Sequence, residues 1–159
     1  MRTVYEYEAA APTRLCFRVA ADVECWPDIL RHYRRARFLR RDGFATGLVE
    51  MAAWRPLGPI PIGWPVWWLS EMHHDAEQHR VIYEHVYGIT SGMNVLWEMT
   101  PVGAATSRIR VLYEWCGPAW PLIGRLAADW VIGPVFVRAI AKRTLVGVAL
   151  EAERRHRYR

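Results

Sequence analysis

Four histidines and one aspartate between positions 73 and 85 could suggest a metal site: His73, His74, Asp75, His79 and His85. A zinc site takes three or four such imidazole or carboxylate ligands around one ion. Because neighbouring side chains on a strand face opposite ways, His73 and His74 cannot readily share an ion. The spacing therefore indicates the polar end of a hairpin, and we predict neither a metal site nor a cofactor.

Tyr33 and Glu84 are the residues that could transfer a proton. A tyrosine hydroxyl inside a cavity can act as an acid or base, but tyrosine is also common as a core or rim aromatic. An inward-facing, half-buried Glu84 would have a raised pKa and could act as a base, whereas alternation alone allows it equally to face water. The sequence contains no nucleophile motif, phosphate-binding loop or dinucleotide fingerprint.

Alternation of side chains along extended segments predicts the sheet that would position these groups. Met93, Val95 and Trp97 share one face of a strand, and together with Trp68 they would form an apolar wall. The predicted strands cover residues 3–9, 33–41, 44–54, 66–74, 78–87, 93–99 and 108–115. Short turns separate most of them, so we expect hairpins and an antiparallel sheet with one wet face.

The longest amphipathic pattern runs from Gly133 to Arg155 and predicts a helix roughly 33 Å long. Pro134 suits its first turn, where a missing N–H would have had no partner. A broad, largely apolar stripe follows at helical spacing. Its members are Phe136, Val137, Ile140, Ala141, Thr144, Leu145, Val148 and Ala149. A concave partner must cover this stripe, and the strands should supply it.

Three shorter helices are also expected. The first starts after Pro12 and ends near Asp22, and the second begins around Cys25, with Pro27 marking the break between them. Residues 121–131 show a further short amphipathic pattern.

Residues 55–65 contain four prolines and two glycines, so we expect a loop and no regular central strand. Loops usually cross a wet surface, yet this one carries Leu57, Ile60, Ile62 and Trp64. These apolar side chains should cover something apolar, and we expect the segment to be a lid over a cavity mouth. The alternatives are a membrane contact, a contact with a second subunit, and permanent packing on the domain.

Composition indicates a folded, basic protein. The 159 residues are 52% hydrophobic, which excludes a disordered chain, and one domain over residues 1–159 is the default. Nine tryptophans are available to line a pocket or fill a core. The net charge is +5, and the basic tail 154–159 should be a solvated, frayed end. The alternative for the tail is attraction to an anionic lipid surface or to nucleic acid, although no nucleic-acid motif accompanies it.

Cys16, Cys25 and Cys116 are odd in number and widely spaced, which fits neither a disulfide framework nor a zinc site. We expect buried thiols at these positions. The N-terminus lacks the hydrophobic segment of a signal peptide, and charges interrupt the apolar run over residues 120–150. We therefore expect a cytoplasmic protein and no transmembrane span.

The predicted order of elements is a strand, two short helices, about six strands in hairpin succession and a long helix. A strongly twisted sheet of about seven strands can curl around one helix. We therefore predict an α+β helix-grip fold, in which a curved antiparallel sheet wraps on the C-terminal helix and leaves a cavity between them.

Short stretches throughout the chain carry a family resemblance. They are Ala11-Pro12, Asp22 with Trp26-Pro27, Leu30 and Tyr33, then Trp68-Leu69-Ser70-Glu71, Met93-Asn94 with Trp97, and the C-terminal helix. With them the chain resembles the START-like (SRPBCC, Bet v 1-like) superfamily, in its polyketide cyclase/dehydrase and coenzyme Q-binding branch. The resemblance implies a cavity for lipids, quinones or polyketides. In bacterial aromatase/cyclases it implies folding of a poly-β-keto chain and dehydration of the closed ring.

The resemblance also assigns a pocket tyrosine to Tyr33. The cyclases have two pocket arginines. At the first of these positions this chain has Met72, and the second position falls near Glu84. Both departures remove a cation that could polarise a ketone, which affects cyclase chemistry more than ligand binding.

We predict that the protein binds a hydrophobic small molecule, either a polyketide, an isoprenoid quinone or a lipid. The first alternative is a polyketide aromatase/cyclase that uses Tyr33 and Glu84, and the second is a partner-binding protein that uses the 55–65 loop and the basic tail. We expect a monomer or homodimer that binds no nucleic acid and that can contact a membrane surface peripherally. The predicted ligand-binding residues are Trp26, Tyr33, Trp54, Trp64, Trp68, Ser70, Met72, Met93, Val95, Trp97, Val111, Tyr113, Phe136, Ile140 and Thr144.

Overall fold

A computed structural model describes residues 1–57, 60–117 and 138–158 of the protein. Its strands are β1 (Arg2–Ala9), β2 (Tyr33–Arg41), β3 (Thr46–Leu57), β4 (Ile60–Asp75), β5 (Arg80–Gly88), β6 (Asn94–Gly103) and β7 (Thr106–Glu114). Its helices are α1 (Thr13–Ala21), the 3-10 turn η1 (Val23–Cys25), α2 (Trp26–Ile29) and α4 (Arg138–Arg157). The helix expected over residues 121–131 lies outside the described residues.

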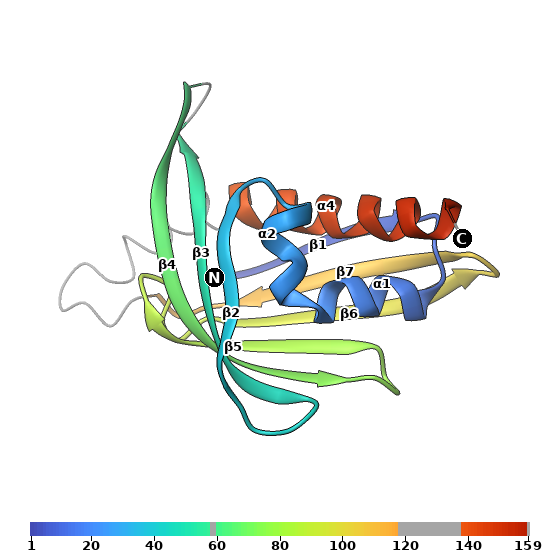
Figure 1. The fold of residues 1–159 in the computed structure, drawn as a ribbon, viewed down its shortest axis with the longest axis horizontal. Coiled ribbons are helices and arrows are strands. Elements are labelled where there is room, and N and C mark those ends of the chain that lie inside the picture. Colours follow the sequence, from blue (N-terminus) through green and yellow to red (C-terminus); the bar gives the residue numbers. More distant parts are fainter. Residues whose placement is uncertain (58–59, 118–137, 159) are drawn as a thin grey trace.

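The strands of the described chain form one antiparallel sheet in the order β1-β7-β6-β5-β4-β3-β2. Consecutive strands from β2 to β7 pair as hairpins, and β1 pairs with β7. Figure 1 shows that the sheet is strongly curved: β3 and β4 run across the direction of β6 and β7, and α4 lies along the sheet. The predicted helix-grip arrangement is confirmed, including the two short helices that follow the first strand.

Helix α4 buries the stripe that its sequence predicted. Ile140 and Leu145 are buried, as are the small residues that follow at Val148, Ala149 and Ala152. The helix packs on β1 and α1, with further contacts to α2, β3 and β7. At Gly147 a Cβ atom would lie 2.2 Å from Leu30 Cδ2, so a glycine there allows α2 to approach α4 closely.

The expectation of a loop over residues 55–65 is wrong. Strands β3 and β4 stay paired up to Leu57 opposite Ile60. However, β2 pairs with β3 only as far as Ala53, and β5 pairs with β4 only from Trp68 onward. The distal hairpin is therefore a two-stranded ribbon, which projects from the sheet in Figure 1. Each strand of such a ribbon has a free edge, where a proline without an N–H is tolerated.

Two further expectations about chain ends and turns are corrected. The strand expected to end at residue 99 continues as β6 to Gly103, through a register shift beside Pro101. The tail expected to fray continues α4 to Arg157. Glu151 holds it there, because its carboxylate accepts hydrogen bonds of 2.7 Å from both Arg154 and Arg155.

The three cysteines are free thiols, but they are not all buried. Cys16 is buried as expected, Cys25 is half-buried, and Cys116 is exposed. The expectation is wrong for Cys116, because this residue follows the end of β7 and leaves the sheet. No helix in the described part of the chain has the length and apolar character needed to cross a membrane.

Candidate ligand-binding cavity

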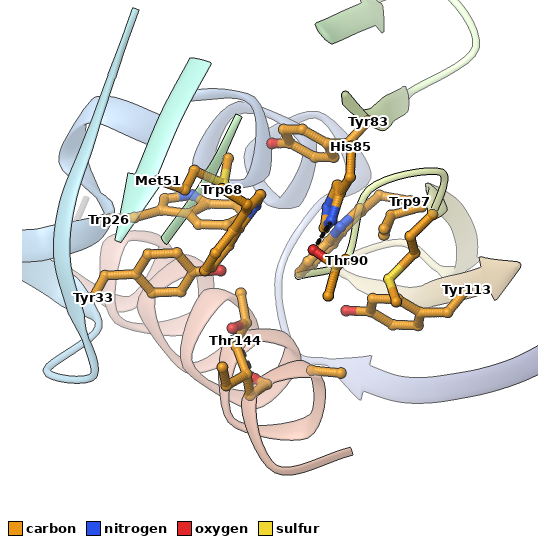
Figure 2. Close-up of a pocket in the computed structure, with 14 residues that line it drawn as sticks. Trp26, Tyr33, Met51, Trp68, Tyr83, His85, Thr90, Trp97, Tyr113 and Thr144 are labelled. Carbon is orange, nitrogen blue, oxygen red and sulfur yellow. Dashed lines mark hydrogen bonds between the residues drawn. The ribbon is translucent and has the colours of Figure 1, made fainter. Parts of the chain in front are cut away.

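A cavity of about 60 Å³ lies between the sheet, α2 and α4. Figure 2 shows how its side chains converge from the strands on two sides and from α4 below. The described lining residues are Trp26, Tyr33, Met51, Trp68, Tyr83, His85, Thr90, Met93, Val95, Trp97, Tyr113, Ile140, Ala141 and Thr144. None of them carries an acidic side chain, a lysine or an arginine.

The period of two along each strand places these side chains on the inner face. On β6, Val95 and Trp97 are buried, while Asn94 faces out. On β5, Tyr83 and His85 point toward the cavity, and a register shift beside Ser70 then leaves both Val86 and Tyr87 exposed. The strand alternation thus builds an apolar wall, and α4 adds Ile140, Ala141 and Thr144.

Trp26 is the centre of an aromatic cluster in this wall. Its ring centroid lies 5.1 Å from that of Tyr33, 6.2 Å from Tyr83 and 5.9 Å from Trp97. Its indole N–H donates a hydrogen bond of 3.2 Å to the carbonyl oxygen of Val19, which fixes the ring against α1. Edge-to-face and tilted rings of this kind are favourable and hold the wall in shape.

Three tyrosines line the cavity: Tyr33, Tyr83 and Tyr113. Burial raises the pKa of each phenol above its ordinary value. All three hydroxyls are therefore protonated at neutral pH and can donate hydrogen bonds.

His85 is a neutral polar group in the wall. Its ring stacks on Trp68, with centroids 5.8 Å apart and an interplanar angle of 25°, and its Nδ1 lies 2.7 Å from Thr90 Oγ1. Desolvation lowers the pKa of the imidazole to about 3. Thr90 reaches this position from the turn that begins at Gly88, which has a φ of 100° and no room for a Cβ beside the carbonyl oxygen of Trp67.

Thr144 connects the cavity to a second neutral histidine. Its hydroxyl donates to the carbonyl oxygen of Ile140 at 2.9 Å and lies 3.0 Å from His32 Nε2. Because that hydroxyl has a single proton, His32 is the donor in the second bond. Burial, together with the charge of Arg143, lowers the pKa of His32 to about 4.

The sequence matches the model of the family described as polyketide cyclase / dehydrase and lipid transport over residues 9–140. The chain belongs to this family. No curated protein matches the sequence significantly.

Solved structures show the same fold. The Zhui aromatase/cyclase from Streptomyces sp. R1128 is similar with a TM-score of 0.82 and 20% identity, over 98% of this chain and 94% of that one. A START superfamily protein from Mycobacterium smegmatis follows with a TM-score of 0.68 and 14% identity, over 99% and 97%. Ginseng major latex-like protein 151 from Panax ginseng has a TM-score of 0.68 and 12% identity, over 98% and 97%.

Most of the pocket residues that the sequence suggested for this family member do line the cavity. They are Trp26, Tyr33, Trp68, Met93, Val95, Trp97, Tyr113, Ile140 and Thr144. Two others cannot be placed: Phe136 lies outside the described residues, and the side chain of Trp64 is not described.

Four suggested residues do not line the cavity. Trp54 is 41% exposed on the outer face, where the Arg34 guanidinium lies 4.5 Å from its ring centroid. Alternation explains this, because the neighbouring Ala53 is the inward residue with no exposure. Ser70, Met72 and Val111 are fully buried but belong to the core beside the cavity.

Glu84 does not face the cavity either. It is exposed on the outer face of β5, opposite Glu71 on β4 and Asn94 on β6. The role of an inward-facing base, which the sequence suggested for Glu84, is therefore corrected.

Within residues 1–57, 60–117 and 138–158, no three acidic, histidine or cysteine side chains lie close enough together to hold a metal ion.

Sequence reasoning missed five lining residues: Met51, Tyr83, His85, Thr90 and Ala141. Alternation on β5 could have identified Tyr83 and His85, because they lie on the same face of the strand as the inward-facing Val81. Helical spacing could have identified Ala141 next to Ile140 in the apolar stripe. Thr90 had no signal, because its position depends on how the turn after β5 folds back.

Proposed function

We propose that this protein binds a hydrophobic small molecule in the cavity between the sheet and α4. The character of the described wall carries the proposal: aromatic and apolar side chains surround a few neutral polar groups. A concave, mostly apolar surface with few convergent polar groups is typical of small-molecule sites. Membership of a family described as polyketide cyclase / dehydrase and lipid transport agrees with it.

The cavity must widen to hold such a molecule. Its volume of about 60 Å³ is room for roughly four water molecules, and an apolar cavity on the order of 150 Å³ holds one benzene. Met51 and Met93 line it, and their unbranched side chains adapt to new shapes more easily than rings do. We therefore propose that ligand entry repacks part of the wall.

Native mass spectrometry of the protein purified from its own host tests the proposal. We expect a retained apolar compound that is released on denaturation. Ala141→Phe, which fills the cavity from α4, should retain much less of it, whereas Leu150→Phe on the exposed side of the same helix should retain as much as wild type. Protein that carries no compound would count against ligand binding and favour the partner-binding alternative.

A polyketide aromatase/cyclase is the second candidate, and the position of Tyr33 favours it. The tyrosine lines the cavity with a protonated hydroxyl that could act as a general acid. The Zhui protein, which has the same fold, is an aromatase/cyclase by name. Against this candidate, no cation among the described lining residues is available to stabilise an enolate.

We also propose that residues 1–159 are a single START-like domain that acts in the cytoplasm as a monomer or homodimer. A peripheral contact with a membrane surface is compatible with the net charge of +5. Size-exclusion chromatography with light scattering distinguishes the monomer from the homodimer.

A further inference from the structure

A second hollow lies on the outer face of the sheet, at the base of the distal ribbon. This outer groove has a volume of about 290 Å³ and is lined by Arg34, Arg35, Ala52, Pro65, Val66 and Trp67. None of them is among the described residues that line the cavity. An apolar cavity on the order of 150 Å³ holds one benzene. The outer groove is therefore large enough for a ring with a small polar group attached.

The two arginines reach the outer groove because β2 is irregular at this point. A register shift between Tyr33 and Arg35 adds one residue to the strand. Regular alternation would place one outward residue between the buried Tyr33 and Ala36, but the bulge places both Arg34 and Arg35 there, and both are exposed. Bulges often re-aim side chains in this way. Two consecutive guanidinium groups therefore lie on one face of the sheet.

A small residue separates these arginines from an aromatic ring. Ala52 on β3 pairs with Arg35 on one side and with Trp67 on the other. Its methyl group forms the floor of the outer groove, and the longer side chains of its neighbours form the walls. Trp67 is 40% exposed, and its indole N–H donates a hydrogen bond of 2.9 Å to Glu50, which fixes the ring. The outer groove thus combines a cationic wall with a flat aromatic wall.

The charges around the outer groove leave Arg34 available to an anion. Glu50 accepts a hydrogen bond of 2.6 Å from Arg37 and lies 3.5 Å from Arg35. Arg34 has no carboxylate partner among the described residues, and its guanidinium carbon lies 4.5 Å from the ring centroid of Trp54. Stacking on a ring leaves the N–H donors at the edge of a guanidinium available to an oxygen. Three arginines against one carboxylate make this part of the surface positive.

We propose that the outer groove binds a phosphate monoester whose attached group is aromatic or apolar. The oxygens of a phosphate can accept from both guanidinium groups, whereas a carboxylate has two oxygens and is matched by one guanidinium. The attached group packs on the exposed surfaces of Trp67 and Pro65. A soluble aryl phosphate and a phosphatidic acid headgroup share this chemistry. The site is separate from the cavity and goes beyond the proposed function.

Calorimetric titration with phenyl phosphate at pH 7 and low salt tests the proposal, with inorganic phosphate and benzoate as comparison probes. We expect phenyl phosphate to bind most tightly, because it alone supplies both the phosphate and the ring. Arg34→Gln should weaken its binding roughly 10-fold, the lower value for a hydrogen bond to a charged group. Arg108→Gln is the matched control, since Arg108 is also exposed but is paired with Glu8, and it should leave the binding unchanged.

Ala52→Leu distinguishes a shaped site from general attraction to positive charge. It fills the floor of the outer groove and changes no charge, so it should weaken phenyl phosphate binding as much as Arg34→Gln does. Circular dichroism checks that the variant is folded. Ala141→Phe, which fills the cavity instead, should leave phenyl phosphate binding unchanged and so distinguishes the two sites.

Flotation with phosphatidylcholine vesicles, with and without phosphatidic acid, identifies the source of the phosphate. Binding that depends on phosphatidic acid and is weakened by Arg34→Gln and Ala52→Leu would assign the outer groove to a lipid headgroup. Phenyl phosphate binding without vesicle binding would assign it to a soluble ligand.

Three results would overturn the proposal. They are binding that neither variant weakens, benzoate binding as tight as that of phenyl phosphate, and failure of both phenyl phosphate and the vesicles to bind. Each of them would leave the proposed function of the cavity standing.

Discussion

At the scale of single residues, Tyr33 is the group whose chemistry distinguishes a binding protein from an enzyme. It is 7% exposed, packs edge-on against Trp26 and Trp68, and lines the cavity. Burial raises the pKa of its phenol. Tyr33 can therefore donate a hydrogen bond or a proton at neutral pH, but it is not a base there in the free protein.

The substitution Tyr33→Phe removes one hydroxyl and little volume. If the protein only binds a ligand, affinity should fall by about 1 kcal/mol or less, the value of a neutral hydrogen bond. If Tyr33 is a general acid, turnover of an identified substrate should fall by roughly two to four decades. Titration and steady-state kinetics measure the two quantities.

Two other substitutions act as controls for Tyr33. Tyr83→Phe alters another hydroxyl in the same wall, which reaches only the Ala20 carbonyl at 3.5 Å. Glu84→Gln alters an exposed residue on the outer face, and we expect it to change neither affinity nor turnover. Turnover that survives in Tyr33→Phe would remove Tyr33 from any catalytic mechanism.

At the scale of elements, α4 closes the sheet, and Ile140 tests this role. The side chain is 8% exposed and lines the cavity. Ile140→Asp places an unpaired charge in an apolar site, at a cost of several kcal/mol. Because whole domains are stable by only about 5–15 kcal/mol, we expect this variant not to fold, as judged by circular dichroism.

Leu150→Asp is the matched control on the same helix. Leu150 is 50% exposed, so the new carboxylate stays in water. We expect its melting temperature to lie close to that of the wild type. A cooperative, wild-type melting curve for Ile140→Asp would show that α4 does not pack on the sheet as described.

The distal ribbon of β3 and β4 is the second element with a testable role. Its pairing up to Leu57 opposite Ile60 makes it a hairpin, but whether it acts as a lid stays a prediction. If it is a lid, a saturating ligand should slow hydrogen exchange at the amides of Leu57, Gly58, Ile60, Ile62, Gly63 and Trp64. Trp64→Ala should then speed ligand release more than it lowers the melting temperature.

The amides of β7 serve as the internal reference for the lid experiment, because this strand is paired on both sides by β1 and β6. Equal exchange in the ribbon with and without ligand would indicate permanent structure and end the lid hypothesis.

At the scale of the whole molecule, two partly buried neutral histidines predict a loss of stability in acid. The pKa of His85 is lowered to about 3 and that of His32 to about 4, both by burial first. The unfolded chain, with ordinary values near 6.5, takes up protons before the folded chain does. Stability is therefore complete above about pH 6.5 and is lost as the pH falls toward these lower values.

Urea unfolding at pH 7.0, 5.5 and 4.5 measures this effect. The expected slope is up to about 1.4 kcal/mol per pH unit for each histidine that stays neutral. His85→Phe should reduce the slope by the contribution of one histidine. Replacement of the exposed His73 by Phe should leave the slope unchanged. The hydrogen bond from Arg154 lowers the pKa of Glu151 below its ordinary value of 4.5, so this carboxylate adds to the loss of stability near pH 4.5. The comparison between pH 7.0 and 5.5 therefore isolates the histidine contribution best. A flat profile between pH 7.0 and 4.5 would contradict the neutral state of both histidines.

Local patterns along the chain were sufficient to predict the architecture. Apolar residues recur every two residues along a strand and every 3.6 residues along a helix, because one side of each element meets the core. The strands, the short helices and the α4 stripe could therefore be read from the sequence. The same alternation identified Trp68, Val95 and Trp97 as wall residues. A resemblance carried by short motifs added the pocket position of Tyr33, which alternation alone could not provide.

Tertiary structure decided the features that depend on where elements end and what lies beside them. The prolines of residues 55–65 are compatible with a strand because β2 and β5 stop short of the ribbon, which is a property of neighbours and not of the segment. Val86 and Tyr87 are both exposed because a register shift interrupts the alternation at the end of β5, and Thr90 reaches the cavity because the chain turns back at Gly88. The outward position of both Arg34 and Arg35 could not be foreseen, since a bulge is defined only by how β2 pairs with β3.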